Sequence, residues 1–129
     1  MKIKSSIARV NHSTELLFLK LSGVETYERL MPEGTVFTKI DHNRFRFKIG
    51  SMPEIGLAIG EKQLNESIVL TSFSDKIPFS LRGQFTKISE AQSDVQLHFE
   101  GDFNPMMAMM VKKPLTQLMD SIISNMHKL

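Results

Sequence analysis

NPMMAMMVKKPLTQLMDSIISNMHKL, residues 104–129, is the longest stretch of the chain with a helical pattern. Asn104 predicts an N-cap, and Pro105 suits the first helical position because its missing N–H would be unpaired there. A helix of this length spans roughly 37 Å at ~1.5 Å per residue. Apolar residues recur on one face at steps of three and four, at Met107, Val111, Leu115, Leu118, Ile122, Met126 and Leu129. We therefore expect one long C-terminal helix that crosses the rest of the fold.

The first turns of this helix differ from the remainder. Met106, Met107, Met109 and Met110 cover more than one helix face. Methionine is flexible and polarisable, and it is enriched at binding surfaces that accept varied shapes. For each methionine taken alone, packing in the core is the plainer interpretation. Taken together they cover too much surface for one face, so one face lines a pocket, its mouth or a partner surface, or is exposed. Pro114 removes a backbone hydrogen bond, so it predicts a kink or break.

The residues before this helix change from a helical to a strand period. Residues 2–10 alternate, with Ile3, Ser5 and Ile7 on one side, and predict a strand. Two short helices follow at 14–21 and 24–31, with a capping box predicted from Ser22 to Glu25. Six further strands are predicted at 34–40, 44–50, 54–62, 67–74, 78–88 and 93–101, with a turn at Asp75-Lys76.

This order predicts an α+β fold in one domain, residues 1–129, in which a curved seven-stranded antiparallel sheet wraps a long C-terminal helix. Strand 67–74 is ambiguous, because both of its faces carry apolar residues, and Ser72 or Thr71 could orient a ligand. By alternation, the inner wall of the sheet includes Phe45, Phe47, Leu57, Ile59, Leu81, Phe85, Val95, Leu97 and Phe99.

The element order, with EGDFNPMMAMMVKKPLTQLMDSIISNM (100–126) joining the last strand to the helix, resembles the START and polyketide-cyclase-like (SRPBCC) superfamily. These helix-grip folds include the birch-pollen allergens. The resemblance rests on the order of elements, the helix pair after the first strand and the Asn104-Pro105 entry to the helix. It implies an apolar cavity between sheet and helix for lipids, hormones or polyketides. A minority of members are cyclases or hydrolases, and others bind partners.

Catalytic and metal-binding signatures are missing from the sequence. There is no cysteine, no G-x-S-x-G context and no pair of histidines at helical spacing. We therefore expect no catalytic residue, metal or cofactor. The stretch RFRFK, residues 44–48, alternates phenylalanines with cations, but period two places them on opposite faces of a strand. A solvated outer face, extended by Arg82, Gln84 and His98, is the interpretation we prefer to a nucleic-acid platform, so no nucleic-acid partner is expected.

Charge and hydropathy set the remaining expectations. The net charge is +2, which is too mild to indicate nucleic acid or an anionic membrane. The N-terminus lacks the apolar run of a secretory signal, and no stretch approaches the length of a membrane-spanning helix. Together with the absence of cysteine, these features predict a cytoplasmic protein without stable membrane insertion.

The leading hypothesis is a non-catalytic binding or carrier domain for a small hydrophobic or amphipathic ligand, held between the sheet and the C-terminal helix. The alternative is a protein-interaction module that binds a partner or a second copy of itself through the methionine-rich helix start. An enzyme of cyclase or hydrolase type is a third hypothesis. The residues predicted to contact the ligand are Phe47, Leu57, Ile59, Leu81, Phe85, Leu97, Phe99, Met106, Met107, Met110, Val111 and Leu118.

Overall fold

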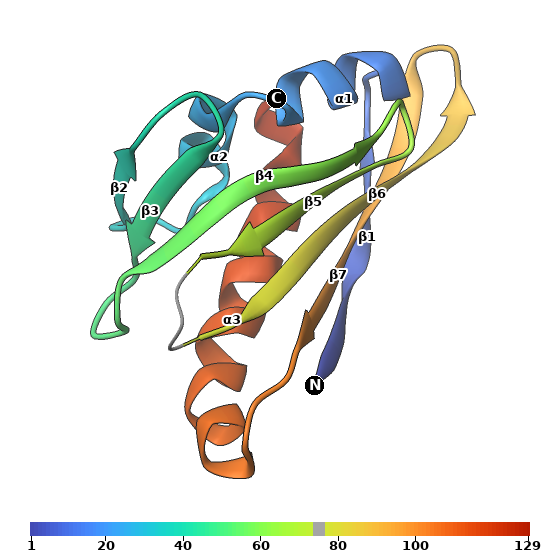
Figure 1. The fold of residues 1–129 in the computed structure, drawn as a ribbon. Coiled ribbons are helices and arrows are strands. Elements are labelled where there is room, and N and C mark those ends of the chain that lie inside the picture. Colours follow the sequence, from blue (N-terminus) through green and yellow to red (C-terminus); the bar gives the residue numbers. More distant parts are fainter. Residues whose placement is uncertain (74–76) are drawn as a thin grey trace.

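The elements of the structure, a computed structural model that describes residues 1–73 and 77–129, follow the predicted order (Figure 1). Ser74, at the predicted end of one strand, and the predicted turn at Asp75-Lys76 lie outside these residues. The elements are β1 (Lys2–Val10), α1 (Thr14–Leu21), α2 (Val24–Leu30), β2 (Val36–Lys39), β3 (Arg44–Lys48), β4 (Ile55–Gln63), β5 (Ser67–Ser72), β6 (Phe79–Ser89), β7 (Gln92–Gly101), α3 (Pro105–Asn125) and a 3-10 turn (Met126–Lys128).

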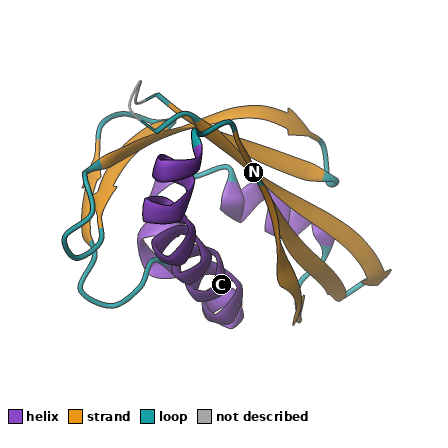
Figure 2. Ribbon diagram, turned by 90° about the horizontal axis from the view of Figure 1, so that it is seen from below, coloured by secondary structure: helices purple, strands orange, loops and turns teal. Residues whose placement is uncertain are grey.

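The strands form one seven-stranded sheet in the order β1-β7-β6-β5-β4-β3-β2, and each neighbouring pair is antiparallel. Figure 2 shows the sheet arching over α3, with the helices on one side of it. The two ends of the described sheet are thus β1 and β2. From β2 onward each strand lies beside the one before it, so the last strand, β7, comes to lie next to β1. The prediction of an α+β helix-grip fold is confirmed.

The core lies between the inner face of the sheet and the helices. In β5, Ile68 and Leu70 are buried and Thr71 is exposed, which resolves the ambiguity of this strand. The inner wall predicted by alternation is confirmed, because all nine of its side chains are buried: Phe45, Phe47, Leu57, Ile59, Leu81, Phe85, Val95, Leu97 and Phe99.

The predicted face of β1 is wrong beyond its middle. The register of β1 against β7 shifts between Lys4 and Ile7, so one extra residue reverses the alternation. Ile7 is consequently exposed, while Val10 is buried. Ser5 stabilises the bulge, because its hydroxyl accepts a hydrogen bond from the Leu97 N–H at 2.9 Å and donates one to the Ser6 carbonyl at 2.6 Å.

The capping box predicted between α1 and α2 is also wrong. Gly23, not Ser22, is the N-cap of α2, and it has no side chain to accept a hydrogen bond. The Ser22 hydroxyl instead donates to the Phe18 carbonyl at 2.6 Å, and the Thr26 hydroxyl donates to the Lys20 carbonyl at 2.6 Å. These two side chains therefore satisfy carbonyls at the end of α1 rather than the N–H groups that begin α2.

The long helix α3 begins as predicted and does not break. The Asn104 side chain accepts a hydrogen bond from the Met107 N–H at 2.8 Å, and Pro105 is the first helical residue. The helix then runs through Pro114 to Asn125, so of the predicted kink or break, the break is wrong. Burial differs on the two sides of this proline: only Val111 is buried before it, while after it the buried residues of α3 are Leu115, Leu118, Met119, Ile122 and Ile123.

Candidate functional site

The space between the sheet and α3 is almost completely filled by side chains. A small cavity lined by described residues of the sheet and the helices has a volume of about 20 Å³. Ligand pockets in proteins typically measure ~300–1,000 Å³, whereas ~10–15 Å³ is enough for one water molecule. The interior of this structure therefore holds a water-sized void. Its lining residues are Leu21, Tyr27, Ile68, Leu70, Leu81, Gly83, Val95, Leu97, Ile122 and Met126.

The residues predicted to contact a ligand fall into two groups. The first group is part of the packed core, and only Leu81 and Leu97 of it line the small cavity. The second group is the methionine-rich helix start, where Met107 is half-buried against the core but Met106 and Met110 are exposed. The buried group consists of Phe47, Leu57, Ile59, Leu81, Phe85, Leu97, Phe99, Val111 and Leu118.

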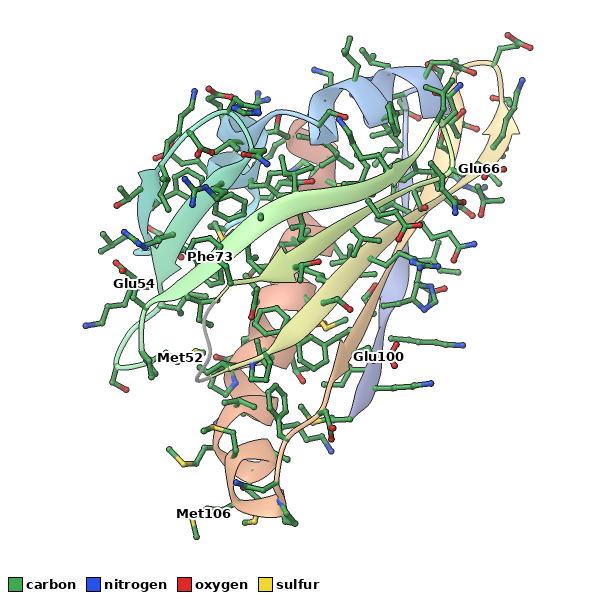
Figure 3. All side chains as sticks on the ribbon, viewed as in Figure 1. Met52, Glu54, Glu66, Phe73, Glu100 and Met106 are labelled. Carbon is green, nitrogen blue, oxygen red and sulfur yellow. The ribbon has the colours of Figure 1, made fainter. Side chains whose placement is uncertain are left out.

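The exposed methionines form one surface, which we call the methionine stripe: Met106, Met109 and Met110. Their exposed fractions are 75%, 83% and 68%. Positions i, i+3 and i+4 share one face of a helix, so the three side chains are neighbours on the outer face of α3. Figure 3 labels Met106 at the far end of α3, which extends beyond the edge of the sheet. The stripe is an exposed apolar patch rather than the lining of a pocket.

Comparison with known proteins identifies the fold. No protein-family model matches the sequence, and no curated protein is significantly similar to it in sequence. Solved structures do match. A START superfamily protein from Mycobacterium smegmatis aligns with a TM-score of 0.61 and 16% identity over 90% of this chain and 90% of that one. The chain has a START-like fold.

Two further structures agree with this assignment. Protein Ms6760 from Mycobacterium smegmatis aligns with a TM-score of 0.72 at 9% identity, over 98% of this START-like chain and 88% of its own. The Aha1 dimer from Colwellia psychrerythraea aligns with a TM-score of 0.59 at 11% identity, over 98% of both chains. The resemblance inferred from the order of elements is confirmed for the fold. Identities this low transfer no ligand, activity or partner.

Tyr27 is a buried side chain with a hydroxyl group that was not predicted from the sequence. It lines the water-sized cavity and stacks on Phe45, with 5.4 Å between ring centroids. Its hydroxyl donates to the Leu21 carbonyl at 2.6 Å, and burial raises the pKa of the Tyr27 phenol. The spacing Val24–Tyr27–Leu30 could have indicated that this face of α2 is buried. Ser72, suggested earlier for a ligand-orienting role, donates to the Ile77 carbonyl.

Because Tyr27 is the only tyrosine, its ionisation can be followed directly. An acid whose folded pKa is raised binds more protons in the folded than in the unfolded state above its ordinary pKa, ~10 for tyrosine, so stability falls there as pH rises. We expect no phenolate absorbance until the protein unfolds, and then a cooperative rise that coincides with loss of the circular dichroism signal. A gradual phenolate titration while the circular dichroism stays native would contradict the burial of Tyr27.

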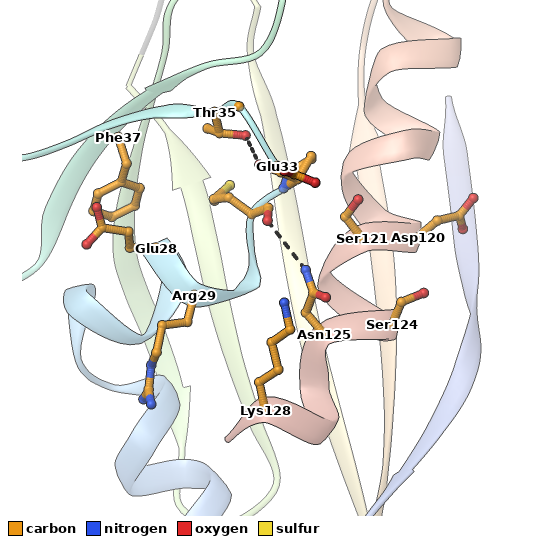
Figure 4. A pocket seen from close by; sticks show the side chains of 13 residues that line it. Glu28, Arg29, Glu33, Thr35, Phe37, Asp120, Ser121, Ser124, Asn125 and Lys128 are labelled. Carbon is orange, nitrogen blue, oxygen red and sulfur yellow. Dashed lines mark hydrogen bonds between the residues drawn. The ribbon is translucent and has the colours of Figure 1, made fainter.

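A large open hollow of about 660 Å³ lies between α2, the loop that follows it and the last turns of α3 (Figure 4). The Asn125 side chain donates to the Leu30 and Met31 carbonyls at 3.2 and 3.4 Å, which ties α3 to the end of α2. The charged residues around the hollow are of mixed sign: Glu28, Glu33 and Asp120 with Arg29 and Lys128. Such a lining favours no single ligand chemistry.

The arginines of β3 lie on the outer face of the sheet, as alternation predicts, but they have an aromatic neighbour. Phe73 lies over Gly56, and its ring centroid is 6.0 Å from the Arg44 guanidinium and 5.9 Å from that of Arg46. Arg44 also pairs with Asp41 at 2.7 Å, and Arg46 lies 3.8 Å from Glu54. The cations are therefore already engaged by partners within the chain.

Among residues 1–73 and 77–129, no three histidine, aspartate or glutamate side chains gather in a way that could hold a metal ion. Two of the four histidines contact backbone carbonyls, His12 that of Leu129 and His127 that of Ser124. No helix in the described part of the chain is long and apolar enough to cross a membrane.

Proposed function

We propose that this chain is a non-catalytic interaction domain that binds a partner protein through the methionine stripe. The observation that supports this most strongly is the exposure of Met106, Met109 and Met110 on one face of α3. Contiguous exposed apolar side chains on a folded domain are typical of interaction sites. An interior with a void of only about 20 Å³ makes surface binding the simpler use of this fold.

The stripe has the spacing with which an amphipathic helix fills a groove on another protein, with anchors at i, i+3 and i+4. Lys112 and Lys113 follow the stripe after the buried Val111 and are exposed. The partner surface that fits this arrangement is an apolar groove with an acidic rim beside it. Burying one methionine contributes about 1.5–3 kcal/mol, and association itself costs several kcal/mol, so three anchors support a reversible rather than a permanent complex.

The test compares two variants that each replace exposed apolar side chains by glutamine. One changes Met106, Met109 and Met110 together, and the control changes Leu19 and Leu64, which are exposed elsewhere. Glutamine and methionine have similar helix propensities, so α3 stays folded. The chain is labelled in cells with a photoreactive methionine analogue and cross-linked there. We expect mass spectrometry of the products to identify one partner, attached at positions 106–110. The stripe variant should lose this partner from a tagged pull-down, and the control should keep it.

Two results count against the proposal. One is a partner that binds the stripe variant as well as the wild type, and the other is cross-links from methionines elsewhere in the chain. A concentration-dependent mass in sedimentation that the stripe variant abolishes would identify a second copy of this chain as the partner. One structure with a similar fold, that of Aha1 from Colwellia psychrerythraea, is a dimer, which is the reason for measuring this outcome. We also propose a cytoplasmic location, which fractionation of cells tests.

The second candidate function is the binding of a small hydrophobic or amphipathic ligand between the sheet and α3. The observation that favours it is the lining of the small cavity, where Tyr27 supplies the one hydroxyl among apolar side chains. Such a ligand requires the side chains around this cavity, which include Ile122 and Met126, to move apart, because the interior is otherwise packed. Native mass spectrometry of the purified protein would then detect a bound apolar molecule, and a protein mass without any addition argues against a carrier.

A further inference from the structure

A second hollow, of about 360 Å³, lies on the outer face of the sheet, opposite the helices. Figure 3 looks onto this face and labels Glu100 near its lower end and Glu66 near its upper end. The pairing of the strands aligns Lys4 of β1 with His98 of β7, and His98 with Arg82 of β6. Three basic side chains are therefore direct neighbours in one row across the sheet.

This row is electrostatically unfavourable when the His98 ring is protonated, because a third cation then lies directly between Lys4 and Arg82. Cross-strand neighbours have Cβ atoms ~4.5–5.5 Å apart, and like charges placed directly opposite one another are destabilising. Within residues 1–73 and 77–129, no ion pair includes Lys4, Arg82 or His98. Burial, with the charges of Lys4 and Arg82, lowers the pKa of the His98 imidazole. Natural proteins break local rules of this kind mainly at functional sites, which makes this row a candidate.

The other side chains of the hollow can complete a site for an anion. Gln84 and Ser80 add neutral hydrogen-bond donors, and Val69 ends the row with an apolar side chain. Lys2 is a further cation in the next row on this face of the sheet, where the strand register places it opposite Glu100. Glu100 is the carboxylate in the hollow, and Glu66 lines an adjoining one with Arg82. Cations thus outnumber carboxylates here in a chain whose net charge is only +2.

We propose that this basic hollow, formed by Lys4, Arg82 and His98, binds the phosphate group of a free phosphorylated small molecule. A phosphate offers several oxygens to the guanidinium, ammonium and imidazole groups at once, and charge-assisted bonds of this kind are stronger than neutral ones. The volume exceeds that of a single phosphate, so the organic part of the ester lies beside Val69. The methionine stripe is on α3, so this site works independently of the proposed partner binding.

The test is an NMR titration of the wild-type chain at low ionic strength, where electrostatic binding is least screened. The probes are sodium sulfate, whose charge is constant near neutral pH, and α-glycerophosphate, with glycerol as the uncharged control. We expect shifts confined to the residues around Lys4, Arg82 and His98. Lys4→Gln and Arg82→Gln should each weaken binding by about tenfold or more. The control, Lys87→Gln, removes a charge from β6, the strand of Arg82, at a position outside the hollow. It should change binding by less than about twofold.

The pH dependence supplies a second readout. Sulfate should bind more tightly as pH falls through the lowered pKa of His98, because the protonated ring adds a charge, and His98→Gln should remove this dependence. Equal weakening by Lys87→Gln would overturn the proposal, as would shifts spread over the whole surface. Binding to phosphatidylserine vesicles that α-glycerophosphate does not compete would also overturn it, and would assign the face to a membrane surface.

Discussion

Replacing Met119 by alanine should lower the free energy of unfolding by about 2–5 kcal/mol, whereas the same change at Met109 should alter it by less than about 0.5 kcal/mol. Both methionines lie in α3, but Met119 is only 1% exposed and Met109 is 83% exposed. Alanine has the higher helix propensity in both cases, so burial is the variable that separates them. Urea unfolding followed by circular dichroism measures both values.

The physical reason lies in how the two halves of α3 are packed. Removing the Met119 side chain leaves a cavity among well-packed neighbours, which adds to the lost transfer free energy. Removing the Met109 side chain only exposes a little more helix to water. Equal losses of stability in the two variants would mean that the stripe is packed against the fold, and the proposed interaction surface would then not exist.

Replacing Pro114 by alanine should raise the free energy of unfolding by about 2 kcal/mol. Proline inside a helix is ~3 kcal/mol less favourable than alanine, because it lacks the N–H and crowds the preceding turn. Part of this gain, ~0.4–1 kcal/mol, is offset because alanine gives the unfolded chain more freedom. The matched control is Pro105→Ala, at the first position of α3, where proline is compatible with the helix and the effect should be small.

Hydrogen exchange adds the local consequence of the same substitution. The missing bond to the Met110 carbonyl separates a well-packed half of α3 from a half in which only Val111 is buried. Amides from 107 to 113 should therefore exchange faster than those from 118 to 123 in the wild type, and Pro114→Ala should narrow the difference. If Pro114→Ala destabilises the protein, the proline is required by the packing of α3 and does not loosen its first half.

The sequence predicted those parts of the fold that depend on short periodic patterns. Phe45 and Phe47 alternate with Arg44 and Arg46 along β3. The two phenylalanines lie in the core and the two arginines are exposed, as predicted. The β1 bulge was not predicted, because it depends on the hydrogen bond between Ser5 and Leu97, which are 92 residues apart. Arg82 and His98 were predicted to lie on the outer face of the sheet, but their alignment in one row with Lys4 depends on strand register in the same way.

The candidate site was predicted less completely than the fold. The methionines before Pro114 could be recognised as too numerous for one face, and Met107 and Met110 do separate into half-buried and exposed positions. Cavity volume, however, depends on how side chains from several elements interlock, and no sequence pattern specifies it. The position of Tyr27 against the internal void depends in the same way on the packing of α2 under the sheet.

The most direct test of the methionine stripe is an NMR spectrum of the chain with 13C-labelled methionine methyl groups, titrated with octanol as an apolar probe. The account predicts that the methyl signals of Met106, Met109 and Met110 shift, while those of the buried Met119 and Met126 do not. Shifts at Met119 and Met126 with an unperturbed stripe would contradict it, because the apolar probe would then have entered the space between the sheet and α3.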